Sequence, residues 1–246
     1  MSKKDILVVS AHAADYCTRA GGAIARYVQE GYAVHIIAIT YGARGESGNY
    51  WAGKPGGTEE ECCEIRHAES QAAAEYLGAT IEFWGYNDYP LTFDEERLRR
   101  LTRRILDIRP DIILTHWIQD PTNHDHELTG NAVIRAVSSG AQLGAFPDTP
   151  AHYFPNIYFF ESTVPLGEFN AFNPDTYMAI DDVFDRKIEA IKRFACQPQL
   201  AGYYIHTAKH RGFQAKNWAK QDITYAEAFK RYLPYVGTML PVTERP

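Results

Sequence analysis

Short runs of consecutive apolar residues recur along the chain, separated by longer stretches of mixed polarity. Such runs, rich in Val and Ile, are typical of strands that are buried on both faces of a parallel sheet. The runs predict strands at Ile6 to Val9, Val34 to Thr40, Thr80 to Trp84, Asp111 to Thr115 and Asn156 to Phe160.

The stretches between these runs have the spacing of helices. They predict helices at Thr18 to Glu30, Thr58 to Leu77, Asp94 to Ile108 and Glu127 to Val137. Strands that alternate with helices indicate an α/β fold, here a Rossmann-like, doubly wound and mostly parallel sheet. Its ligand site should lie at the carboxyl ends of the strands, near the point where the strand order reverses.

The pattern changes from about Glu168 onward. A short apolar run at Tyr177 to Ile180 precedes two long helical candidates, Asp181 to Phe194 and Gln199 to Arg211. We interpret residues 1–246 as a single domain, with a core of about 1–165 and a C-terminal helical cap of about 166–246. The glycine-rich segment Gly42 to Thr58 predicts a long loop that forms a wall or lid of the site.

Composition narrows the classes of partner. The chain of 246 residues is 45% hydrophobic and 23% charged, as in ordinary soluble globular proteins. Its net charge of −6 argues against nucleic acid and leaves room for a local pocket that binds a small anionic metabolite. No apolar stretch approaches the length of a membrane span, so we expect a cytoplasmic protein. Tyrosine clusters at 203–204 and 232–235 fit either core packing, a pocket wall or the interface of a homo-oligomer.

Candidate chemistry begins directly after the first predicted strand, in Ser10-Ala11-His12-Ala13-Ala14-Asp15. Imidazole and carboxylate are ordinary ligands of zinc and ferrous iron, and this spacing lets His12 and Asp15 converge on one cation. Taken alone, such a pair is more often an ordinary loop histidine and a helix-capping aspartate than a pair of metal ligands.

A second candidate segment follows the fourth predicted strand. Residues 116–126, His-Trp-Ile-Gln-Asp-Pro-Thr-Asn-His-Asp-His, contain three histidines. We expect His126 to be the third ligand, Asp125 to orient an imidazole, and His124 to face either substrate or solvent. Two histidines, one carboxylate and open positions are typical of a catalytic site for one divalent metal, with zinc as the first choice and ferrous iron or cobalt as alternatives.

These two segments resemble the LmbE-like, or PIG-L, family of metal-dependent N-acetylglucosaminyl deacetylases. That family carries an Ala-His-Pro-Asp-Asp-Glu loop before a Gly-Gly helix start, and a later His-x-Asp-His loop; residues 11–16 and 123–126 match them. The resemblance implies that His12, Asp15 and His126 hold the metal. It also places Ala14 where the family has its general base, and Asn123 where it has the histidine that assists the transition state.

The departures are shared with one subgroup, the 4-oxalomesaconate (4-carboxy-2-hydroxymuconate) hydratases. The resemblance extends to Arg-Ala-Gly-Gly-Ala-Ile-Ala at 19–25, Gly-Glu-Ser at 45–47, Asp-Tyr-Pro-Leu at 88–91 and Thr-Tyr-Ala-Glu-Ala at 224–228. It implies that Glu46 activates the water. Addition of water to an activated C=C bond needs such a base, and no amine has to leave.

The catalytic acid has no counterpart in this chain. The subgroup histidine follows Phe-Glu-Pro, whereas residues 160–163 read Phe-Glu-Ser-Thr. The candidates to replace it are His152, His124, His206 and His210. We expect Arg44, in the glycine-rich loop, to clamp a substrate carboxylate, and His152 to contribute to substrate binding.

Three functions remain open. The first is a metal-dependent hydratase (hydro-lyase) acting on an unsaturated di- or tricarboxylate in aromatic-acid catabolism, with Glu46, Asn123, Asp125 and His124 as catalytic residues. The second is a deacetylase acting on an aminosugar or a natural-product intermediate. The third is a non-catalytic binding protein that keeps the metal pocket.

Overall fold

A single mixed sheet organises the described part of the chain. The computed structural model describes residues 4–148, 154–163 and 169–243. The sheet has seven strands: β1 (Asp5–Ser10), β2 (Ala33–Thr40), β3 (Thr80–Tyr86), β4 (Ile112–His116), β5 (Asn156–Phe160), β6 (Thr176–Ala179) and β7 (Ala226–Arg231). The helices are α1 (Asp15–Gln29), α2 (Gly48–Gly53), α3 (Glu59–Leu77), α4 (Glu95–Ile108), α5 (His124–Gly140), α6 (Phe184–Ile191) and α7 (Leu200–Ala219). This confirms the predicted α/β class.

The strand order β3-β2-β1-β4-β5-β7-β6 contains one reversal point. The chain runs outward from β1 through β2 to β3, then returns to β4 on the other side of β1. These strands and β5 are parallel, and Val9 of β1 pairs with Thr115 of β4. The loops that leave β1 and β4 therefore start side by side, at the position where sheets of this kind bind ligands.

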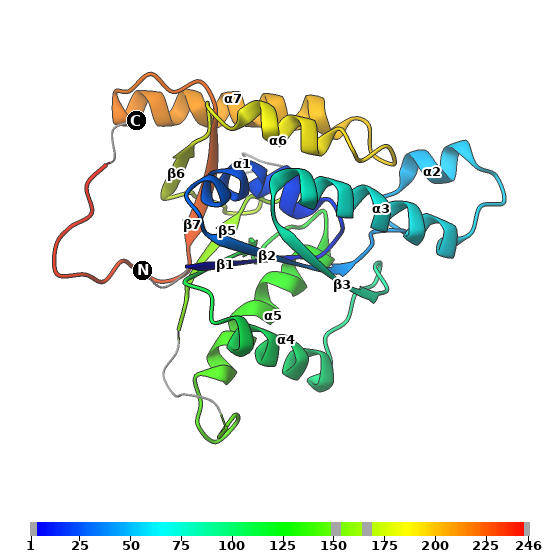
Figure 1. Cartoon of the computed structure of the whole chain (residues 1–246), viewed down its shortest axis with the longest axis horizontal. Coiled ribbons are helices and arrows are strands. Elements are labelled where there is room, and N and C mark those ends of the chain that lie inside the picture. Colours follow the sequence, from blue (N-terminus) through cyan, green and yellow to red (C-terminus); the bar gives the residue numbers. More distant parts are fainter. Residues whose placement is uncertain (1–3, 149–153, 164–168, 244–246) are drawn as a thin grey trace.

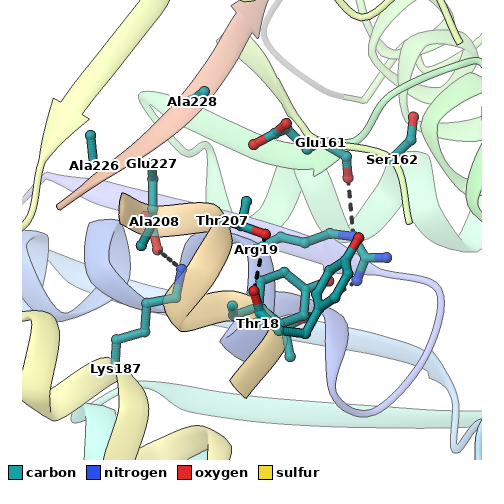
Figure 2. Close-up of a pocket in the computed structure, with 12 residues that line it drawn as sticks. Thr18, Arg19, Glu161, Ser162, Lys187, Thr207, Ala208, Ala226, Glu227 and Ala228 are labelled. Atoms are coloured by element: carbon teal, nitrogen blue, oxygen red, sulfur yellow. Dashed lines mark hydrogen bonds and ion pairs between the residues drawn. The ribbon is translucent and has the colours of Figure 1, made fainter. Parts of the chain in front are cut away.

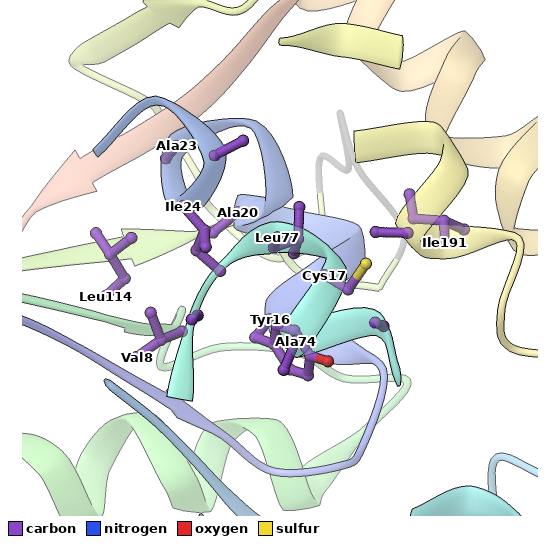
Figure 3. Close-up of a cluster of buried hydrophobic side chains, with 14 of the residues drawn as sticks. Val8, Tyr16, Cys17, Ala20, Ala23, Ile24, Ala74, Leu77, Leu114 and Ile191 are labelled. Atoms are coloured by element: carbon purple, nitrogen blue, oxygen red, sulfur yellow. The ribbon is translucent and has the colours of Figure 1, made fainter. Parts of the chain in front are cut away.

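Helices cover both faces of the sheet, with α1, α3, α6 and α7 on one side and α4 and α5 on the other (Figure 1). The residues of β1 alternate between the two cores: Ile6 and Val8 join one apolar cluster, and Leu7 and Val9 join the other. Figure 3 shows part of the first cluster, where Val8 lies near Ile24 of α1. Burial on both faces explains why the strand is a continuous apolar run.

The C-terminal part is more than the predicted helical cap. Helix α6 packs against α1 and α3, as a cap would (Figure 1). The same part also adds two strands to the central sheet, because β7 pairs antiparallel with both β5 and β6. The run at Tyr177 to Ile180 is largely β6, and β7 was not predicted. The predicted long loop at 42–58 likewise contains the short helix α2.

Strand β7 also supports the first helix. Helix α1 has a non-helical residue at Ala20, which leaves the backbone N–H groups that follow without helical partners. The buried Glu227 carboxylate of β7 accepts hydrogen bonds from two of them, those of Gly22 and Ala23, both at 2.8 Å. Lys187 of α6 neutralises that carboxylate at 2.6 Å. The C-terminal part thus holds α1 in position.

In the part of the chain that the structure describes, no helix is long and apolar enough to span a bilayer.

Close packing of α5 on the end of β4 predicts that Gly130→Ala is strongly destabilising. A Cβ at this position would lie 2.3 Å from the backbone oxygen of His116. Overpacking against a backbone atom should lower the free energy of unfolding by about 2 to 3 kcal/mol, measured by urea denaturation. The matched control is Gly202→Ala in α7, where a Cβ meets nothing within 4 Å; its better helix propensity should raise stability by up to about 1 kcal/mol. Equal stability of the two variants would contradict this packing.

Candidate metal centre

Four side chains with metal-binding atoms converge at the carboxyl edge of the sheet. His12 lies in the loop after β1, Asp15 begins α1, Glu46 lies in the loop after β2, and His126 is in the first turn of α5. One ligand atom from each lies within 4.8 Å of the others. His12 Nδ1 is 3.2 Å from Glu46 Oε1 and 3.2 Å from His126 Nε2. Asp15 Oδ1 is 3.4 Å from His126 Nε2. Two imidazoles and two carboxylates form a donor set that fits a divalent transition metal.

Both imidazoles are oriented from behind by carboxylates. His126 Nδ1 lies 2.9 Å from Asp120 Oδ2, and His12 Nε2 lies 3.3 Å from Asp125 Oδ2. A proton held on these outer nitrogens leaves the inner nitrogens, His12 Nδ1 and His126 Nε2, free to bind a cation. Paired carboxylates of this kind are the usual outer support of metal-binding histidines.

The carboxylate of Asp15 is fixed by donors from the loop after β1 and from α1. Its Oδ2 accepts a hydrogen bond from the backbone N–H of His12 at 2.7 Å, and its Oδ1 accepts one from Arg19 at 2.8 Å. Arg19 also donates through Nε to the backbone oxygen of Glu161, at the end of β5 (Figure 2). The guanidinium therefore ties a candidate ligand to the end of β5, two strands away from β1 in the sheet.

The pocket drawn in Figure 2 lies behind this arginine, between α1, α7 and β7. Its charged groups are already paired: Arg19 with Asp15, Lys187 with Glu227, and Glu161 with Arg211. We therefore interpret the paired residues that line the pocket as structural support of α1.

Comparisons with known proteins identify the family to which this chain belongs. The family described as GlcNAc-PI de-N-acetylase, PIG-L, matches residues 7–137, which include all four side chains of the group. The chain belongs to the PIG-L family.

A curated relative and a solved structure, both from Pseudomonas putida KT2440, are similar over nearly the whole chain. The relative named 4-oxalmesaconate hydratase is 38% identical over 238 residues, which cover 95% of this chain and 91% of that one. The crystal structure of GalB, the 4-carboxy-2-hydroxymuconate hydratase, has a TM-score of 0.91 at 38% identity and covers 97% of this chain and 100% of that one. The N,N'-diacetylchitobiose deacetylase of Pyrococcus horikoshii shares the fold, with a TM-score of 0.78 at 20% identity over 94% of this chain and 84% of that one.

The PIG-L resemblance assigns His12, Asp15 and His126 as ligands, and the structure brings all three together. It adds Glu46 as a fourth member of the group. Asn123 lies beside it, because Asn123 Nδ2 donates to Glu46 Oε1 at 3.2 Å. The Asn123 Oδ1 atom is buried and has no hydrogen-bond partner among the described residues.

Two other predicted site residues pair with carboxylates outside the group of four. The side chain of His124 is 82% exposed and pairs with Glu127 at 2.9 Å. The Arg44 guanidinium pairs with Glu59 at 2.8 Å. His206 and His210 are on α7, and His152 lies outside the described residues. At the position of the missing subgroup histidine, Thr163 donates to Asp120 and lies 3.1 Å from His126 Nδ1.

Two supporting residues of this PIG-L site were not assigned roles from the sequence. Asp120 orients His126. Its position in the same loop, six residues before that histidine, is the sequence feature from which this role could have been predicted. His116 ends β4 and stacks on His126, with ring centroids 4.1 Å apart. Its Nε2 accepts a hydrogen bond from the backbone N–H of Ala11, so it supports the site instead of facing the cation. Burial, with the neighbouring His126, lowers the pKa of His116 to about 3.

The group favours positive charge at its centre. Burial alone would lower the pKa of His126, but the Asp15 carboxylate and the hydrogen bond with Asp120 raise it to about 9. Burial likewise opposes protonation of His12, yet Glu46, Asp125 and Asp15 raise its pKa well above the ordinary value. The pKa of Glu46 is lowered, because His12 outweighs the effect of burial. Without a metal, protons on the imidazoles balance the carboxylates.

Metal affinity should therefore rise with pH. Because the pKa of His126 is raised from 6.5 to about 9 in the metal-free protein, a proton competes with the cation below that pH. The apparent zinc affinity, measured by competition with a chelator, should increase up to about tenfold per pH unit for each displaced proton. The part of this rise that comes from His126 should level off above about pH 9.

The companion variant Asp120→Asn weakens the interaction that raises this pKa. Its affinity should be about 10- to 100-fold lower, and the rise should end at a lower pH. An affinity independent of pH in the wild-type protein would contradict the assignment of His126 as a ligand.

Proposed function

We propose that this protein is a metal-dependent hydratase that adds water to a C=C bond of a small unsaturated di- or tricarboxylate. The main observation behind the proposal is that a carboxylate from a different loop stands in for the missing family base. The position of the family base holds Ala14, and Glu46 lies 3.2 Å from His12 Nδ1. Similarity over nearly the whole chain to a hydratase of Pseudomonas putida KT2440, in both sequence and structure, supports the same reaction. We further propose that the protein acts in the cytoplasm, in the breakdown of aromatic acids.

His12, Asp15 and His126 would hold the metal, with zinc as the first choice and ferrous iron or cobalt as alternatives for this donor set. A divalent cation held there supplies a bound water of lowered pKa and polarises an oxygen of the substrate.

Glu46 would take one proton of the attacking water while the water oxygen bonds to one carbon of the C=C bond. The other carbon takes up a proton from water, so that one molecule of water is added in total. Glu46 is the most exposed member of the group, with a side chain that is 13% exposed, so it faces the side from which substrate arrives. Its lowered pKa keeps it ionised and able to accept a proton. The hydrogen bond from Asn123 fixes one of its oxygens and positions the carboxylate. Asn123 is thus a positioning residue in this reaction.

Ala14 suits an anionic substrate. Its side chain is buried, next to Asp15 in sequence, and joins the apolar cluster under α1. A carboxylate at this position would add negative charge beside Asp15 and Glu46, where a substrate with two or three carboxylates must bind.

The second candidate function is deacetylation of an N-acetylated sugar or natural product. It is favoured by the intact ligand set and by the family description as a de-N-acetylase. In this reaction Glu46 would act as the base, and an acid for the leaving amine would have to come from elsewhere.

Replacement of the base tests the hydratase directly. The zinc-loaded protein should consume 4-carboxy-2-hydroxymuconate with loss of its conjugated ultraviolet absorbance. Glu46→Gln should lower kcat by about 10²- to 10⁴-fold, because the amide cannot accept the proton of the attacking water. Release of amine from N-acetylglucosamine derivatives, with no loss of absorbance from the enol acid, would favour the deacetylase instead.

Ala14→Asp separates the two functions. An added charge about 4 Å from a substrate carboxylate costs about 4 kcal/mol at an effective dielectric constant of about 20. Hydration should therefore fall by about 10²- to 10³-fold in kcat/KM, whereas a weakened deacetylase should gain activity from its restored base. Ala13→Ser, a neighbouring polar change without charge, is the control, and hydration unaffected by Ala14→Asp would argue against this account of the site.

A further inference from the structure

The metal centre is reached from the side of Glu46. The side chains of His12, Asp15 and His126 are only 0 to 2% exposed, whereas that of Glu46 is 13% exposed. Groups that lie beside Glu46 and also reach solvent are therefore the ones that a bound substrate meets first.

Tyr89 lies on that side. Its ring stacks on the His12 imidazole, with centroids 6.0 Å apart and an interplanar angle of 18°. Its edge packs on Gly45, the neighbour of Glu46, so closely that a Cβ there would lie 2.0 Å from Tyr89 Cε2. Tyr89 is nevertheless 44% exposed. Its hydroxyl makes no hydrogen bond within the described ranges.

The backbone of Tyr89 is in a strained conformation. Its φ is +43°, a left-handed conformation that residues with a Cβ rarely adopt. The Asp125 carboxylate fixes it, accepting hydrogen bonds from the N–H groups of Tyr89 and Leu91, both at 3.0 Å. Asp125 also orients the His12 imidazole. Strained residues held by such contacts cluster at functional sites.

Arg44, which we expected to bind a substrate carboxylate, is paired with other residues of the protein. The Arg44 guanidinium binds Glu59 and the backbone oxygen of Asp88. Asp88 also accepts hydrogen bonds from the backbone N–H groups of Arg44 and Gly45, which docks the loop of Glu46 against the segment of Tyr89. The unpaired Tyr89 hydroxyl is thus the available donor next to the docked loop.

We propose that Tyr89 is a substrate-contacting residue of this centre: its ring packs on the planar conjugated chain of the unsaturated acid, and its hydroxyl donates a hydrogen bond to a substrate carboxylate. The inference rests on the proposed function for the class of substrate. An aromatic face can stack in an offset arrangement on a flat conjugated chain. A hydrogen bond to a charged acceptor is among the stronger ones.

The test uses two substitutions at this position. Tyr89→Phe removes only the hydroxyl, and Tyr89→Asn removes the ring while tolerating the left-handed backbone. Tyr76→Phe, at the C-terminal end of α3, is the matched control. The probe is trans,trans-muconate, a planar dicarboxylate, titrated calorimetrically into zinc-loaded protein, with the flexible, saturated adipate for comparison.

We expect Tyr89→Phe to weaken muconate binding about tenfold and Tyr89→Asn about a hundredfold. Adipate should bind more weakly than muconate and lose less in Tyr89→Asn. Zinc content and melting temperature should match the wild-type protein. Muconate binding that is absent in the wild type or unchanged in Tyr89→Asn would overturn the inference, and so would loss of zinc from that variant, which would make the role structural.

Turnover separates this inference from the proposed function. If Tyr89-dependent binding is found but the wild-type protein hydrates no enol acid, the proposed hydration fails and the contact stands. If the wild type hydrates 4-carboxy-2-hydroxymuconate and both Tyr89 variants keep its kcat and KM, the contact is wrong and the hydration stands.

Discussion

The concentration of buried negative charge at one edge of the sheet constrains the rest of the structure. Asp15, Glu46, Asp120 and Asp125 surround two imidazoles in a space with little solvent. Carboxylates in such surroundings are stable only when cations or hydrogen-bond donors compensate them. Arg19 supplies one cation, and the remainder must come from protonated imidazoles or from a metal ion. A cation at this position is therefore part of the stability of the fold as well as of its chemistry.

This requirement explains why the C-terminal part is integral to the domain. The helix that carries Asp15 and Arg19 is interrupted at Ala20, only five residues after the ligand. Its second half begins on the Glu227 carboxylate, and Lys187 neutralises that carboxylate in turn. Without β7 and α6 the interruption would leave buried backbone N–H groups unpaired. Similarity to the hydratases over nearly the whole chain, beyond residues 7–137, fits this dependence.

The parts of the site that could be predicted from sequence are those fixed by local chain geometry. His12, Asp15 and His126 follow strands that end side by side, so a pattern of apolar runs was enough to bring them together. The place of Glu46 depends on Asp88, a distant residue that binds the backbone of the Glu46 loop. Pairing of Arg44 with Glu59 depends on tertiary contacts in the same way. Strand β7 escaped prediction because Glu227 and Lys230 interrupt its apolar pattern, although Glu227 is buried.

Charge counting links Ala14 to the class of substrate. A divalent cation offsets the charges of Asp15 and Glu46, the two carboxylates in the group of four side chains. A carboxylate at position 14 would add one more negative charge, which repels each substrate carboxylate by about 4 kcal/mol at about 4 Å and an effective dielectric constant of about 20. A neutral N-acetylated sugar pays no such penalty. A carboxylate in this loop therefore suits an amide hydrolase with an uncharged substrate, whereas an enzyme for polycarboxylates benefits when its base comes from a different loop. The loop after β2 supplies Glu46 as that base, and its Gly45 packs against Tyr89.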